Sequence, residues 1–238
     1  MIELMAAMAL VQAGMAPDPR LDAFRAACVP HRQDLEAAAG LLAAEGWVQV
    51  TDDDHPELTE SMRRARAGMV VDPVEDPGLS MTATFSIWAR DFGEDRFHVI
   101  LNRVDAVIGE TKDSDGDGVI QSWEDAHEMT TLGCGLWDFD AEAMIHPGLM
   151  TAWTGSLPVA SVDRPGEIEG GTWNVYDLMP GTGEVKISFV PEGSPHVATI
   201  GLSGLAITMS SAPLDDDPPS EADPASPEDD PAPTGEQP

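Results

Sequence analysis

Positively charged side chains are scarce in this chain. Lys and Arg number 12 against 43 Asp and Glu, the only lysines are Lys112 and Lys186, and the formal net charge is -31. Nucleic-acid binding and binding to anionic lipid headgroups both depend on a basic surface. The composition therefore argues against both and favours a cation or a basic protein as partner. An alternative interpretation is that the acidic surface serves only solubility.

Cysteine is also scarce: Cys28 and Cys134 are the only two. An even pair in an exported chain favours a disulfide. Cys28 falls on the apolar face of a predicted helix, and Cys134 falls on the inward face of a predicted strand, as a bridge between them requires. We therefore predict the disulfide Cys28–Cys134. In a reducing compartment, the alternative is two buried thiols.

Apolar runs of membrane-spanning length are missing, and the strongest apolar stretch is residues 1–16, MIELMAAMALVQAGMA. Its length is that of a signal peptide, and Val11-Gln12-Ala13 fits a small-x-small cleavage pattern. Glu3 stands where a positive charge is usual, so an ordinary N-terminal helix is the alternative. We predict export, with a periplasmic or secreted mature protein and no membrane span after processing.

Aromatic and basic residues are both absent from residues 212–238, which are rich in Pro, Asp and Glu. Such a composition cannot offset the entropy of ordering, so we predict a disordered acidic tail. Acidic tails can bind basic protein partners, whereas a purely solubilising role is the alternative. Residues 17–211 then form a single domain.

The periodicity of apolar residues changes along this domain from helical to alternating. Helical patterns come first, and an alternating hairpin and further strands follow, separated by Gly and Pro. We predict an α+β fold in which N-terminal helices pack on a mainly antiparallel sheet. The predicted helices cover residues 20–29 and 32–47, a short polar stretch that follows the acidic cluster Asp52-Asp53-Asp54 and ends near Gly68, residues 122–129, and residues 141–155, the last interrupted at Pro147. The predicted strands cover residues 81–90, 96–109, 131–140, 170–179, 184–191 and 197–209.

Acidic residues crowd into the segment DSDGDGVIQSWE, residues 113–124. Asp113, Asp115, Asp117, Gly118 and Glu124 match the pattern D-x-[DN]-x-[DN]-G-x5-E at every required position. The segment resembles the calcium-binding loop of the EF-hand family. The resemblance implies Ca²⁺ as cofactor and a ligand set of Asp113, Asp115, Asp117, the backbone carbonyl of Val119, Gln121 directly or through water, and Glu124.

The chemistry of calcium agrees with these residue types. Ca²⁺ takes oxygen ligands from alternate loop positions, and Gly118 permits the sharp turn between them. The segment before Asp113 is strand-like, Asp125 stands where the family usually has an apolar residue, and Asp52-Asp53-Asp54 does not form a second loop. We therefore predict a lone, structural or low-affinity site. The alternative is a solvated Asp/Gly turn without an ion.

Other motifs do not nominate catalytic residues. Cys28 and His31 have the spacing of half a metal site, but no second Cys/His pair lies nearby. Ser203 lacks the glycine pattern of a nucleophile elbow. The sequence therefore predicts a calcium-binding exported protein. The alternatives are a periplasmic enzyme of unknown substrate with a structural calcium, and an acidic interaction module without metal.

Overall fold

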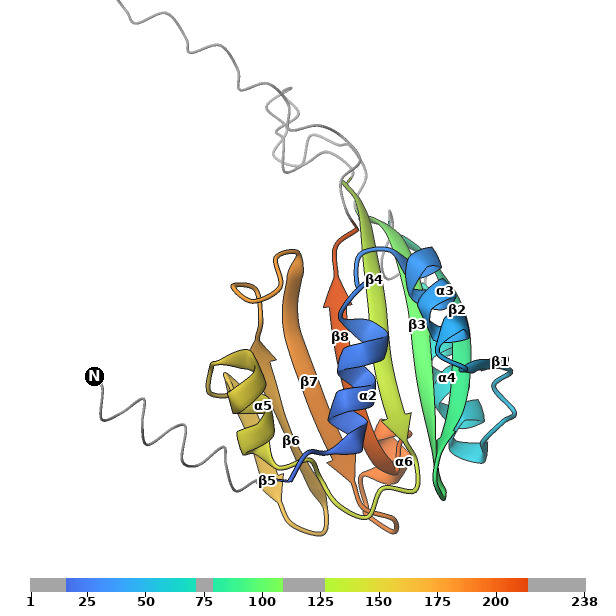
Figure 1. Cartoon of the computed structure of the whole chain (residues 1–238). Coiled ribbons are helices and arrows are strands. Elements are labelled where there is room, and N and C mark those ends of the chain that lie inside the picture. Colours follow the sequence, from blue (N-terminus) through green and yellow to red (C-terminus); the bar gives the residue numbers. More distant parts are fainter. Residues whose placement is uncertain (1–15, 72–78, 109–126, 214–238) are drawn as a thin grey trace, which may run out of the picture.

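An eight-stranded antiparallel sheet with helices on both faces forms the body of the protein in the computed structural model (Figure 1). The structure describes residues 16–71, 79–108 and 127–213. The predicted α+β fold is confirmed. Residues 1–15 of the predicted signal peptide and residues 214–238 of the predicted tail lie outside the described residues. No helix in the described part of the chain is both long enough and apolar enough to cross a membrane.

The helices begin where the sequence provides caps. Asp18 and Asp34 each accept a hydrogen bond from a backbone N–H of the first turn, and His55 does so through its ring. A side chain of this kind satisfies a donor that the helix itself leaves unpaired. The helices are α2 (Pro19–Cys28), α3 (Leu35–Ala44), α4 (Pro56–Gly68), α5 (Pro147–Thr154) and α6 (Val197–Ile200).

The sheet consists of two meanders, in each of which neighbouring strands follow one another along the chain. Its order is β1-β2-β3-β4-β8-β7-β6-β5, and the two meanders join where β4 pairs with β8. The strands are β1 (Val48–Val50), β2 (Ser80–Phe92), β3 (Asp95–Ile108), β4 (His127–Asp138), β5 (Ala160–Arg164), β6 (Ile168–Asn174), β7 (Thr182–Val190) and β8 (Gly204–Ser211).

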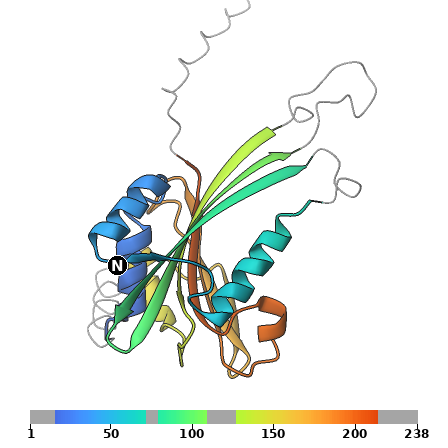
Figure 2. The ribbon, with the colours of Figure 1, turned by 90° about the vertical axis from the view of Figure 1, so that its right-hand side faces the viewer.

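Alternation along the strands divides the core into two layers. Val99 and Leu101 of β3 point to the face covered by α2, α3 and α5, whereas Ile100 points to the opposite face. On that opposite face, Leu58 and Met62 of α4 are buried against the sheet. Figure 2 shows the two helical layers on either side of the sheet, and also shows β2, β3 and β4 extending beyond them.

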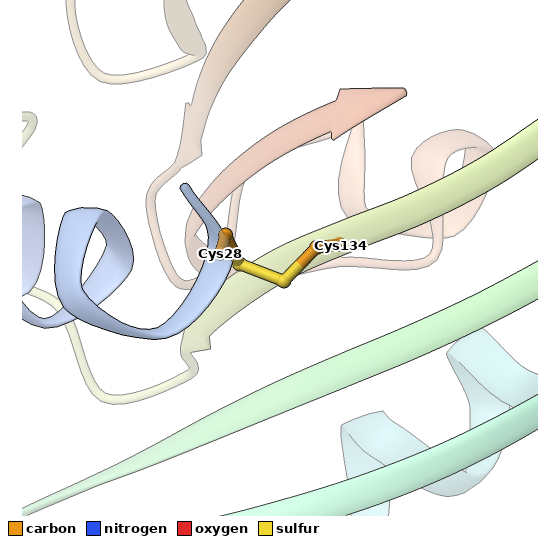
Figure 3. Close-up of a disulfide and its surroundings, with 2 residues drawn as sticks. All are labelled: Cys28 and Cys134. Atoms are coloured by element: carbon orange, nitrogen blue, oxygen red, sulfur yellow. A yellow bond between two sulfur atoms is a disulfide. The ribbon is translucent and has the colours of Figure 1, made fainter. Parts of the chain in front are cut away.

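The disulfide Cys28–Cys134 joins the last residue of α2 to the middle of β4 (Figure 3). The prediction from the sequence is confirmed. Both cysteines are buried in the layer under α2 and α3. The bridge therefore ties the first described helix to a central strand of the sheet.

Several local predictions are wrong. Residues 141–146 were expected to be helical, but α5 begins only at Pro147, and residues 175–179 were expected to be strand, but β6 ends at Asn174. Residues 127–129 were expected to end a helix, but they begin β4 and pair with β3. Residues 197–203 were expected to be strand, but they form the short helix α6 and a turn, and β8 begins only at Gly204. Residues 160–164 were not predicted as regular structure and form the edge strand β5.

Candidate functional site

The predicted calcium ligands Asp113, Asp115, Asp117, Val119, Gln121 and Glu124 lie in residues 109–126, outside the described residues. The described chain fixes the two ends of this segment. Ile108 is the last residue of β3, His127 is the first residue of β4, and the two are antiparallel partners. Residues 109–126 therefore connect two adjacent strands whose ends lie side by side.

Side chains near this end of the hairpin reinforce the pairing. Asp105 of β3 accepts a hydrogen bond of 2.6 Å from the hydroxyl of Thr130 in β4, and its other contact is the guanidinium of Arg103. Hydrogen bonds from Arg103 and then from Thr130 hold the pKa of Asp105 below its ordinary value. The carboxylate is thus charged at neutral pH and links the two strands close to where they leave the described chain.

The strands on either side of the segment differ from the EF-hand family, in which helices enter and leave the calcium loop. Here β3 leads into residues 109–126 and β4 follows them. The strand-like pattern before Asp113 is confirmed. The exit helix expected to continue to Met129 is wrong for its last three residues, because His127, Glu128 and Met129 pair with β3.

The opposite end of β4 carries a buried carboxylate, Asp138. Its side chain is 7% exposed and lies 3.7 Å from Arg20 Nη1. Burial raises the pKa of Asp138 to about 6, against the attraction of Arg20, and the nearby carboxylates Asp95 and Asp140 raise it further. A hollow of about 390 Å³ opens beside these groups. This carboxyl group therefore keeps its proton to a higher pH than an ordinary aspartate does.

Arg20 holds this region together at the start of α2. Its guanidinium donates two hydrogen bonds to Asp18, at 2.7 and 2.9 Å, and one of 2.8 Å to the backbone carbonyl of Ala143. The pKa of Asp18 is lowered by these contacts despite its partial burial. One arginine thus anchors both the helix start and the chain that follows β4.

A histidine–aspartate pair fixes the start of α4 to the sheet. His98 Nε2 of β3 lies 2.8 Å from Asp54 Oδ2, and Arg96 Nε donates to the same oxygen at 2.9 Å. His98 is 1% exposed, and burial lowers its pKa despite the contact with Asp54. Because its pKa is lowered, His98 is neutral at neutral pH and donates its Nε2 proton to Asp54. The neighbouring His55 stacks on Phe139 with ring centroids 4.6 Å apart.

Glu57 and Ser203 make a second link from α4 to the sheet. Both oxygens of Glu57 accept hydrogen bonds from Ser203, one from its hydroxyl at 2.6 Å and one from its backbone N–H at 2.9 Å. These groups line a hollow of about 350 Å³ that also contains Asp140 and Glu192. The arrangement provides a serine held by a carboxylate, which anchors the residue before β8.

The described residues test the remaining candidate motifs. Cys28 is consumed by the disulfide, so it does not form a metal site with His31. Sequence spacing gave no reason to group His55 with His98, but their rings lie 6.1 Å apart. Within residues 16–71, 79–108 and 127–213, no cluster of three or more His, Cys, Asp or Glu side chains is arranged to hold a metal ion. No protein-family model, curated protein or solved structure matched this chain.

Proposed function

We propose that the protein binds one calcium ion through residues 113–124 and is an exported, structural calcium-binding protein. The observation that carries this proposal is the complete pattern of Asp113, Asp115, Asp117, Gly118 and Glu124. Four carboxylates in so short a segment repel one another. A dication coordinated by an oxygen of each carboxylate would offset this repulsion.

The described hairpin supports this proposal by limiting the entropy that binding must overcome. Both ends of residues 109–126 are fixed by the pairing of Ile108 with His127. A closed segment samples fewer conformations than an open one, so less freedom is lost when its oxygens gather around an ion. We expect an affinity on the order of 10⁻⁴–10⁻³ M, as in extracellular calcium modules.

The disulfide supports the proposed location outside the cytosol. A bridge such as Cys28–Cys134 persists in an oxidising compartment and is rare in the cytosol. Together with the apolar residues 1–16, it supports a periplasmic or secreted protein. Calcium is abundant enough outside the cytosol to fill a site of this affinity.

Calcium titration of the full-length chain tests the proposal, with magnesium as the control ion. Trp123 lies within the segment and gives a fluorescence signal. At 10 mM calcium, a dissociation constant on the order of 10⁻⁴–10⁻³ M stabilises the folded state by about 1.4–2.7 kcal/mol. Asp113→Asn and Glu124→Gln should each abolish the fluorescence response and the rise in Tm.

A matched control separates specific binding from general charge reduction. Asp177→Asn with Glu45→Gln removes the same kinds of charge at exposed positions. This control should respond to calcium as the wild type does. Equal responses in wild type and in both segment variants would show that calcium binds elsewhere, and no response to 10 mM calcium would refute the proposal.

A further inference from the structure

An open groove lies between the chain that leads into α5 and the outer strands β5, β6 and β7. Its volume is about 620 Å³, within the range of roughly 300–1,000 Å³ typical of small-molecule sites. In Figure 1 the chain following β4 crosses toward α5 near the ends of these strands. The groove lies near the chain that follows Asp138, whereas His127 is at the other end of β4, about 40 Å of strand away.

The inner surface of the groove is apolar. Ile145 and Phe189 are 0% and 4% exposed, and Met144 beside them is half-buried. Ile145 and Phe189 belong to the larger of the two core layers, so the groove ends against packed hydrocarbon. Above this floor, Met144 and Pro147 keep apolar surface in contact with water, and covering it with the apolar part of a ligand is favourable.

The rim of the groove is negatively charged. Asp163 of β5 and Glu169 of β6 are antiparallel partners, so two carboxylates stand directly opposite each other on one face of the sheet. Like charges in this arrangement destabilise a strand pair. Glu142, from the chain on the other side, adds a third carboxylate, and no Lys or Arg is found among the described residues that line the groove.

We propose that this groove binds a small organic cation, an ammonium group attached to an apolar body. The ammonium group would lie near Asp163 and Glu169 and relieve their mutual repulsion. The apolar body would cover Met144 and Pro147, which line the groove and remain partly accessible. A bare metal ion would gain nothing from that hydrocarbon surface, because hard cations require oxygen ligands on several sides.

Titration of the full-length protein with 2-phenylethylammonium, monitored by backbone amide chemical shifts, tests the assignment. The neutral analogue 2-phenylethanol has a similar size and differs mainly in charge. We expect the cation to shift the amides of Ser161 and Gly171, which lie beside the Asp163–Glu169 pair. The neutral analogue should bind more weakly, and added salt should weaken binding of the cation.

Two matched variants locate the binding charge. Asp163→Asn with Glu169→Gln should weaken binding of the cation about 2- to 30-fold, since each partly exposed charge pair contributes modestly. Asp177→Asn with Glu45→Gln removes equal charge away from the groove and should leave the affinity unchanged. Both variants change exposed or half-buried side chains, so folding should persist.

Three results would overturn the inference. They are an equal loss of affinity in both variants, equal affinity for 2-phenylethanol, and the absence of shifts in β5 and β6. The titration with 2-phenylethylammonium is repeated, with calcium present, on the Asp113→Asn variant, which lacks a proposed calcium ligand. If the same amide shifts appear in this variant, binding in the groove does not depend on the proposed calcium site.

Discussion

Loss of the disulfide Cys28–Cys134 should be the most damaging single covalent change to this protein. The two cysteines are separated by 106 positions in the chain. Cross-linking a loop of about 100 residues lowers the entropy of the unfolded chain by an amount worth about 4.7 kcal/mol at 25 °C. Single domains are typically stable by about 5–15 kcal/mol, so the bridge contributes a large part of the total.

Urea denaturation followed by tryptophan fluorescence measures this contribution. With a slope of about 2 kcal/mol/M, a loss of about 4.7 kcal/mol lowers the midpoint by roughly 2 M. The comparison uses the oxidised wild type, the wild type in reductant, and the Cys28→Ala variant. The reduced wild type keeps both buried sulfur atoms, so it separates the effect of the cross-link from that of packing.

The reasoning fails if reduction lowers the free energy of unfolding by less than about 1 kcal/mol, because the chain-entropy term would then be largely absent. It fails in another way if Cys28→Ala is much less stable than the reduced wild type. In that case, lost packing in the core layer under α2 would outweigh the cross-link.

Two further predictions concern Asp138, the last residue of β4, and Gly204, the first residue of β8. Burial raises the pKa of Asp138 to about 6. Between about pH 4 and 6, the folded protein therefore keeps a proton on Asp138 that the unfolded chain has released. The free energy of unfolding falls as pH rises through this window. Asp138→Asn should therefore stabilise by about 1–3 kcal/mol at pH 7.5 and not at pH 4 in urea unfolding, and a gain independent of pH would contradict this. Gly204 has φ +85°, and an added Cβ would lie 2.6 Å from the carbonyl oxygen of Phe139, whereas Gly193 has φ +79° with open space around it. Gly204→Ala should lower Tm more than Gly193→Ala does, and equal losses would show that backbone strain alone accounts for the effect.

Elements with strong local signals were predictable from the sequence. The apolar spacing of residues 20–29 marks α2, and the alternation after Met81 marks the hairpin of β2 and β3. The same alternation placed Cys134 on the inward face of β4, which made its bridge to Cys28 predictable. In each case the decisive information lies within a few residues along the chain.

Contacts between distant parts of the chain were not predictable. β5 is short and exposed, and its place at the edge of the sheet depends on pairing with β6 rather than on its own residues. The apolar residues from Val197 to Met209 suggested one strand, but Gly201 and Gly204 adopt positive φ and end the short helix before β8 begins. The predicted calcium ligands remain a prediction, because they fall outside the described residues.

The raised pKa of the buried carboxyl group Asp138 was also not predictable from the sequence. Burial in the fold raises the pKa of Asp138, the nearby carboxylates Asp95 and Asp140 raise it further, and Arg20 of α2 opposes the rise. Arg20 and Asp95 are far from Asp138 in sequence, and only Asp140 is close to it along the chain. Only the folded arrangement distinguishes Asp138 from the many other carboxylates of this acidic chain.

The joining of the two meanders at β4 and β8 determines the order in which the protein can fold. β1 to β4 pair with one another in chain order, so these pairings can form early, while loop-closure entropy is small. One edge of β4 then remains unpaired until β8, at residues 204–211, becomes available. An unpaired central strand invites pairing with other chains. Cys28 and Cys134 both belong to the early half, so their oxidation can join α2 to β4 during this interval and limit aggregation of the chain before its last strand pairs.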